Sequence, residues 1–302
     1  MQATHARARS AAVPIAERLA GAPISWGVCE VPGWGYQLDA DTVLAQMREL
    51  GMVATEFGPD GFLATEPAAR AAQMASYGLR AVGGFLPVLL HDEAHDPLPT
   101  VHRFVDACVA TGAGVVVLAA YTGVDGYDER PVLDQDGWDV LLRNLDRAAD
   151  HAASRGVVAA LHPHVGTMVE TGDETERVLT GSRIGLCVDT GHLLVGGADP
   201  VALTAAHPDR VVHVHLKDVD ASRAARVRNG RTTFGGAVRD GMFRPLGQGD
   251  VDIEAMVRTL EEAGYDGWYV LEQDVMLAGP EDGEAAYADV RASLDFLAKV
   301  VP

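Results

Sequence analysis

HVHLKD, residues 213–218, ends a strand-like apolar run with several residues that can bind a divalent metal. Three other segments have the same form: Leu161–His164 (LHPH), Val188–His192 (VDTGH) and Val270–Asp274 (VLEQD). In a barrel of parallel strands, the carboxyl ends of all strands meet at one mouth. The sequence therefore predicts that imidazoles and carboxylates from four neighbouring strands converge on a single ion.

Short β-rich runs alternate with longer stretches of helical period. The predicted strands are 23–27, 53–57, 80–85, 114–119, 157–162, 184–189, 211–216 and 268–272. The predicted helices lie near 40–51, 65–77, 98–112, 135–155, 172–180, 199–207, 252–264 and 284–299. Strict alternation of this kind favours an α/β fold, a single closed (β/α)8 TIM barrel. Nucleotide-binding open sheets are disfavoured, because the chain has neither GxGxxG after the first strand nor GxxxxGK[ST].

The length of 302 residues fits one barrel domain better than two, because such a barrel typically has about 250 residues. We predict an N-terminal extension at residues 1–21, with one helical turn near Ile15–Leu19, and the barrel at 22–302. Residues 219–249 form a connection too long for an ordinary loop after the seventh strand. We interpret this connection as a lid over the mouth of the barrel; the alternative is a tolerated surface insertion.

Composition narrows the range of partners. The net charge of −19 argues against nucleic acid and against an anionic membrane surface. No apolar stretch approaches the length of a membrane span, and the N-terminus lacks the apolar core of a signal peptide. Three separated cysteines without CxxC spacing fit a reducing cytoplasm. The predicted partner is a small molecule, and a homo-oligomer is compatible with the sequence.

The preferred ligand set has one residue from each of the last four strands: His162, Asp189, His215 and Glu272. Mixed imidazole and carboxylate ligands suit Mn²⁺ or Co²⁺, with Zn²⁺ as a further option. Side chains in a strand repeat their direction every two residues, so His213 points to the same side as His215. We prefer His215 as the ligand because it lies nearer the carboxyl end of its strand.

Other residues near these strand ends are candidates for contact with substrate. His164 lies two residues beyond His162 and competes with it as a ligand. His192 is within reach of a substrate hydroxyl, and Lys217 is a candidate cationic polariser or proton donor. Glu56 is predicted either to orient a ligand or to bind substrate, and Trp26 is predicted to cover a sugar ring.

Several of these motifs resemble the xylose isomerase-like barrel superfamily, in which Glu, Asp, His and Glu from four strands hold the metal. This chain has His162 in place of the first Glu. The departure narrows the resemblance to the inosose dehydratases of inositol catabolism. The segments that carry it are APISWG (22–27), LHPHVGT (161–167), DTGHLLVGGADP (189–200), HVHLKDV (213–219), ARVRNGRTTFGGAVRDGMFRPLGQGDVDI (225–253) and YDGWYVLEQD (265–274).

The resemblance implies a Mn²⁺- or Co²⁺-dependent loss of water from a cyclic polyol ketone, 2-keto-myo-inositol. In such a reaction a base removes the α-proton and a general acid assists the departure of the β-hydroxyl. We expect His164 or Glu272 to be the base, and His192 or Lys217 to be the acid.

Three other functions remain as alternatives. A ketose isomerase or epimerase of the same fold uses the same metal without losing water, and the missing Glu at position 162 speaks against it. A non-catalytic sugar-binding or regulatory protein would bind its ligand without the metal. A metal-dependent endonuclease is disfavoured by the acidic charge and by too few ligands for a three-metal cluster.

Overall fold

Parallel strands form the centre of the molecule, and the computed structural model describes residues 13–124 and 126–300. Each strand of the main sheet pairs in parallel with its neighbours. In sheet order the strands are β3 (Arg80–Ala81), β2 (Ala54–Thr55), β1 (Leu19–Gly21), β11 (Tyr269–Leu271), β8 (Val211–Leu216), β7 (Gly185–Asp189), β6 (Val158–Leu161), β5 (Val115–Tyr121) and β4 (Gly83–Leu89).

The barrel closes at Val82, the residue between β3 and β4. Its N–H donates to the carbonyl of Thr55, and its own carbonyl accepts from the N–H groups of Gly114 and Val115. One short segment thus joins β2 on one side to β5 on the other. Gly83 has a φ of +147°, and a Cβ there would lie 1.8 Å from the carbonyl oxygen of Val115. With β3 and β4 taken as one bent strand, the barrel has the eight strands that the sequence predicts.

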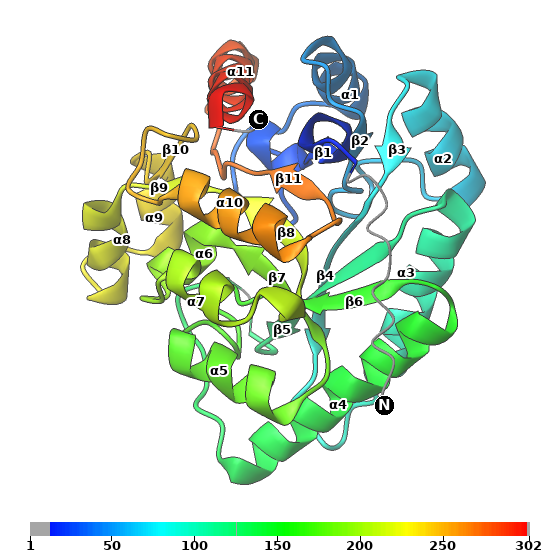
Figure 1. Cartoon of the computed structure of the whole chain (residues 1–302), viewed down its shortest axis with the longest axis vertical. Coiled ribbons are helices and arrows are strands. Elements are labelled where there is room, and N and C mark those ends of the chain that lie inside the picture. The colour runs from blue at the N-terminus through cyan, green and yellow to red at the C-terminus, as the bar shows by residue number, and fades with distance from the viewer. Residues whose placement is uncertain (1–12, 125, 301–302) are drawn as a thin grey trace, which may run out of the picture.

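Helices surround the strands in a ring (Figure 1). Those that match predicted helices are α1 (Ala40–Glu49), α2 (Pro67–Ser76), α3 (Leu98–Thr111), α4 (Gln135–Ser154), α5 (Gly172–Gly181), α7 (Pro200–Ala206), α10 (Ile253–Ala263) and α11 (Gly283–Val300). Three further helices were not predicted: α6 (Thr190–Val195), α8 (Ala221–Arg228) and α9 (Phe234–Arg239). No helix of the described residues combines the length and the apolar character of a membrane span.

The long helix α4 shows how local sequence sets these elements. The Asp134 side chain accepts the N–H of Gly137 at 2.9 Å and so caps the first turn. Leu141, Leu145 and Ala148 repeat at spacings of four and three and are fully buried. The helix therefore turns its apolar stripe towards the core, as the sequence predicts.

The prediction for the first strand was wrong. The strand is Leu19–Gly21, within the stretch that we assigned to the N-terminal extension, and Pro23–Trp26 is a 3-10 helix. The proline explains the error, because its fixed φ favours the first turn of a helix and it lacks an N–H for the strand ladder. The predicted turn near Ile15 is present as a 3-10 helix, Ile15–Arg18. Residues 1–12 of the extension lie outside the described residues.

The long connection of residues 219–249 is folded, and it lies against the carboxyl ends of the strands. Its helices α8 and α9 are followed by β10 (Phe243–Arg244), which pairs antiparallel with β9 (Asp218–Val219) (Figure 1). Apolar side chains of this segment share a small separate core with residues from other loops at the barrel mouth. This core includes Cys29, Trp34, Val165, Val195, Phe234, Val238, Met242 and Phe243. We call residues 219–249 the lid segment.

Candidate metal centre

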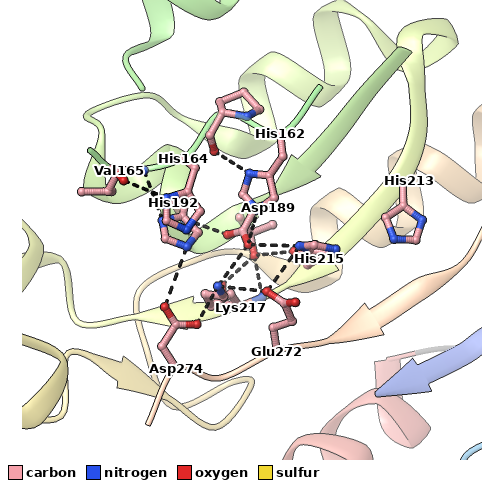
Figure 2. Close-up of polar contacts among 12 residues, drawn as sticks. His162, His164, Val165, Asp189, His192, His213, His215, Lys217, Glu272 and Asp274 are labelled. Carbon is pink, nitrogen blue, oxygen red and sulfur yellow. Dashed lines mark hydrogen bonds and ion pairs between the residues drawn. The ribbon is translucent and has the colours of Figure 1, made fainter. Parts of the chain in front are cut away.

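The four predicted ligands come together at the carboxyl ends of their strands (Figure 2). His162 directly follows β6, Asp189 ends β7, His215 lies in β8 and Glu272 directly follows β11. All four are buried, with exposed fractions from 0% for Asp189 to 8% for Glu272. Each of these four strands thus brings one predicted ligand to the same place.

Ligand atoms of His162, Asp189 and His215 all lie within 4.8 Å of one another, a spacing that one ion can span. Oδ2 of Asp189 is 3.5 Å from Nε2 of His162 and 3.6 Å from Nδ1 of His215. Oε2 of Glu272 is 3.3 Å from the same Nδ1. His162, Asp189 and His215 therefore fit a donor set for a single divalent ion, and Glu272 lies beside them in contact with His215.

Buried atoms without a hydrogen bond support the assignment. Oδ2 of Asp189 and Nδ1 of His215 are both buried and make no hydrogen bond within the described residues. Their charged neighbours are Lys217, 3.2 Å from Oδ2 of Asp189, and Glu272, 3.3 Å from Nδ1 of His215. Buried polar atoms without a hydrogen bond are rare and are suited to bind an ion. Nδ1 of His162 lies 2.8 Å from the Pro163 carbonyl, to which it donates, so Nε2 presents its lone pair to the centre. The residues therefore fit a bound metal.

Asp189 has a second function in the local structure. Its Oδ1 accepts the N–H of His192 at 2.7 Å and so caps α6, which begins directly after the strand. The cap fixes the carboxylate and leaves Oδ2 for the centre. Burial alone would raise the pKa of Asp189, but the ammonium of Lys217 and the neighbouring imidazoles hold it well below its usual value.

Glu56, which follows β2, lies behind His215. Its Oε1 is 2.8 Å from Nε2 of His213 and 3.2 Å from Nε2 of His215. This contact orients the His215 ring so that Nε2–H donates to the carboxylate and Nδ1 faces the centre. Of the two predicted functions of Glu56, the geometry favours orientation of a ligand over contact with substrate. His213 lies deeper in the barrel, as predicted.

Lys217 lies at the opposite side of the centre, facing three carboxylates. Its Nζ is 2.8 Å from Oδ1 of Asp274, 3.0 Å from Oε2 of Glu272 and 3.2 Å from Oδ2 of Asp189. Burial alone would lower the pKa of Lys217, but these carboxylates raise it well above its usual value. Because its pKa is raised, the ammonium is charged at neutral pH. Burial raises the pKa of the neighbouring Asp274 to about 6.

His164 and His192 stack on each other beside the centre, with ring centroids 3.7 Å apart. Nδ1 of His164 donates to the Val165 carbonyl at 2.7 Å, so its Nε2 is an acceptor. Nδ1 of His192 accepts the N–H of Val165 at 3.4 Å, so its Nε2 carries the proton. Burial lowers the pKa of His164 to about 3 and that of His192 well below its usual value. Both rings are neutral at pH 7, one as acceptor and one as donor.

Aromatic side chains of the lid segment and of the loop after β5 enclose this pair. The ring of Phe234 lies 5.7 Å from that of His192, and Tyr127 lies 4.8 Å from His164. Phe243 places its ring 5.2 Å from the ammonium of Lys217. The sequence does not reveal these aromatic contacts, because they depend on how two long loops fold over the mouth.

One predicted function is not supported by the structure, and one residue of the site was missed. Trp26 does not support the predicted function of covering a substrate ring: it is fully buried in the main core, and its indole N–H donates to Gln46 at 2.7 Å. Asp274 was missed as a site residue, although it contacts Lys217. Its position two residues beyond Glu272 was the available signal, since alternation places both side chains on one side.

The family can now be stated from comparison with known proteins. The model of the xylose isomerase-like TIM barrel family matches residues 36–300. The chain belongs to this family. Among curated relatives, the inosose dehydratase of Geobacillus kaustophilus is 34% identical over 87% of this chain and 90% of its own length. The rhizopine catabolism protein MocC of Rhizobium meliloti is 35% identical over 83% of this chain and 80% of its own.

Two solved structures are similar to this chain in fold. The IOLI protein, with a bound zinc atom, has a TM-score of 0.66 at 16% identity and covers 94% of this chain and 98% of its own. The probable 3-DHS dehydratase AsbF of Bacillus anthracis has a TM-score of 0.64 at 13% identity, covering 92% and 98%. At these identities the structural likeness establishes the barrel but not the reaction.

Proposed function

We propose that this protein is a metal-dependent dehydratase, a hydro-lyase that acts on a cyclic keto-polyol, 2-keto-myo-inositol (inosose), in inositol catabolism. The convergence of His162, Asp189, His215 and Glu272 beside an acceptor imidazole is the observation that carries the proposal. The named inosose dehydratases among the relatives, of which the first covers most of both chains, support the same reaction.

The ion would be Mn²⁺ or Co²⁺, with Zn²⁺ as the further option, because the donor set mixes imidazole with carboxylate. When bound, it would act as a Lewis acid on the substrate ketone and a neighbouring hydroxyl and so acidify the α C–H. The four ligands hold it, and Glu56 keeps the His215 ring oriented towards it.

The proton transfers are assigned to residues beside the ion. His164 would take the α-proton at Nε2, which is free of a proton at neutral pH and accepts hydrogen bonds. Glu272 is the weaker candidate for the base, since its Oε2 already faces His215 and Lys217. Lys217 and the Nε2–H of His192 would assist the departure of the β-hydroxyl.

The lid segment has a supporting function in this proposal. The groups assigned to proton transfer are all buried, with exposed fractions of 7% for His164 and 1% for both His192 and Lys217. Substrate therefore has to enter by movement of the covering loops, and their return excludes water from the reactive intermediate. The three cysteines, all in the described residues, are buried and free, which supports a reducing cytoplasmic location.

The test is turnover of 2-keto-myo-inositol by protein stripped of metal and then supplied with Mn²⁺, Co²⁺ or Zn²⁺. A dehydratase yields a conjugated enol-dione with ultraviolet absorbance, whereas an isomerase or epimerase does not. The Asp189→Asn variant keeps an oxygen to cap α6 but loses the ligand charge, so it should fold and lack metal-dependent turnover. Full activity in stripped protein, or a product without the absorbance, overturns the proposal.

A further inference from the structure

Lys217 stands out in the composition of this chain. Lys217 and Lys299 are its only lysines, and the rest of its 24 lysine and arginine residues are arginine. Lys299 is exposed on α11, whereas Lys217 is 1% exposed. An ammonium is a compact point charge, and in that respect it resembles a metal ion more than a planar guanidinium does.

The ammonium contacts two of the carboxylates that a bound metal would also use. Two of its three carboxylate partners, Asp189 and Glu272, are proposed metal ligands, at 3.2 and 3.0 Å from Nζ. The third, Asp274, is closest at 2.8 Å and is not one of the four proposed ligands. An ammonium has three N–H donors, and here it faces three carboxylates.

The lysine stem is held in place by its packing. A Cβ on Gly191 would lie 2.7 Å from both Cγ and Cδ of Lys217, so glycine at this position makes room for the stem. The ring of Phe243 covers the ammonium at 5.2 Å. These contacts hold the ammonium beside its carboxylate partners.

The charge balance explains why a cation is needed here. Four carboxylates are buried around the centre, with exposed fractions of 3% for Glu56, 0% for Asp189, 8% for Glu272 and 6% for Asp274. Buried charge without a partner is strongly destabilising. Among the lysines and arginines of the described residues, only Lys217 forms ion pairs with these four carboxylates, and it pairs with three of them.

We propose that Lys217 is an internal cation that competes with the divalent metal for Asp189 and Glu272, and that Asp274 retains the ammonium once the metal is bound. The inference rests on the proposed metal site. It has two consequences: Lys217 weakens metal binding while stabilising the metal-free barrel, and metal loading frees N–H donors of Lys217 for substrate. Asp274 acts through Lys217 and is a positioning residue.

The experiment is calorimetric titration of Mn²⁺ into the metal-stripped full chain, with variants of each partner. Lys217→Met should bind Mn²⁺ more tightly, roughly 10- to 100-fold, the scale on which outer groups tune metal affinity. Asp274→Asn should bind it more weakly, because the ammonium then remains on the ligands. Lys299→Met, the exposed counterpart, should match the wild type.

A double variant separates this mechanism from a general effect of charge. In the Lys217→Met background, Asp274→Asn should change the Mn²⁺ dissociation constant by less than about twofold, because the residue through which Asp274 acts is absent. Without metal, Lys217→Met should also unfold at a lower temperature than the wild type, and Mn²⁺ should raise its midpoint by more. A purely structural function of Lys217 would weaken metal binding instead.

The outcomes also distinguish this inference from the proposed function. If the wild type binds no Mn²⁺, or Asp189→Asn binds it equally well, the metal site itself is wrong and both proposals fall. If metal binds at Asp189 but Lys217→Met binds it no more tightly, only the competition is overturned. Should Lys217→Met not fold, Asp274→Asn decides alone: equal or tighter Mn²⁺ binding overturns the inference.

Discussion

Nε2 of His215 lies 3.2 Å from Oε1 of Glu56, on the side of the ring away from the proposed metal. Burial alone would raise the pKa of Glu56, but the imidazoles of His215 and His213 hold it well below its usual value. The charged carboxylate therefore accepts a hydrogen bond from Nε2–H, and Nδ1 faces the other proposed ligands. The proposed metal centre thus includes a contact with a residue from the opposite half of the chain.

Glu56→Gln should weaken Mn²⁺ binding by roughly 10- to 100-fold, as loss of a partner behind a ligand typically does. The amide keeps the size of the side chain but loses the charge that fixes the imidazole proton. Titration of metal-stripped protein measures the effect. Glu254→Gln, at an exposed ion pair on α10, is the control and should bind as the wild type does. An unchanged dissociation constant for Glu56→Gln would show that the contact does not orient His215.

His162→Glu restores the carboxylate that the wider family is expected to have at this position. The variant should still bind metal, but its preference should move from Zn²⁺ and Co²⁺ towards Mn²⁺, because a harder oxygen replaces an imidazole nitrogen. We expect the ratio of the Zn²⁺ to the Mn²⁺ affinity to fall roughly tenfold, a shift on the scale of other changes around metal ligands. His95→Glu, at an exposed loop position, is the matched control. An unaltered ratio would remove His162 from the ligand set.

The convergence of the four proposed ligands could be predicted from the sequence, because it depends on strand ends and on alternation within each strand. His215 was preferred over His213 for its position along the strand, and the structure places its Nδ1 beside Asp189. Contact between Lys217 and Glu272 depends on a different quantity, the register between β8 and β11. That register pairs His215 with Val270, so Lys217 and Glu272, each two residues further along its chain segment, come together. No local pattern specifies it.

The first strand and the lid segment show the other limit of local patterns. Leu19–Gly21 is too short and too small in its side chains to read as a strand, and pairing with β11 and β2 makes it one. The lid segment has few apolar residues in a helical period, so its helices were not predicted. Their stability depends on contacts such as Phe234 with His192, which form only once the barrel is closed.

Glu174 should make stability depend on pH at the start of α5. Its Oε2 accepts the N–H groups of Thr171 and Glu170, and its Oε1 pairs with Arg130 at 2.7 Å. Burial alone would raise the pKa of Glu174, but these partners lower it below its usual value. The stabilisation is therefore fully present above the pKa of the unfolded chain and is lost as the pH falls through the lower pKa of the folded state.

Glu174→Gln should accordingly lower the free energy of unfolding at pH 7 by about 0.5–1.5 kcal/mol, the usual range for a hydrogen bond. The difference from the wild type should vanish as the pH falls through the lowered pKa of the folded state, where the wild-type carboxylate also becomes neutral. Urea unfolding followed at several pH values measures this. Glu262→Gln, at an exposed position of α10, should show no such difference. A difference that persisted in acid would assign the effect to packing.

Asp218 anchors the end of the lid segment. Its Oδ1 accepts the N–H groups of Val219 and Val251, and its Oδ2 accepts those of Gly247 and Gly249, all between 2.8 and 3.1 Å. The carboxylate is fully buried. One side chain, directly after Lys217, therefore holds the strand end and the returning chain together.

Asp218→Asn should loosen this end of the lid segment, because the amide has one acceptor oxygen and turns N–H donors towards two backbone N–H groups. Leaving such groups unsatisfied costs about 1–3 kcal/mol each. We expect lower stability in urea and faster tryptic cleavage within residues 219–249 than in the wild type. Asp240→Asn, exposed at the end of α9, is the control and should be cleaved at the wild-type rate. Wild-type stability and cleavage in Asp218→Asn would mean that the lid segment is held by its apolar core alone.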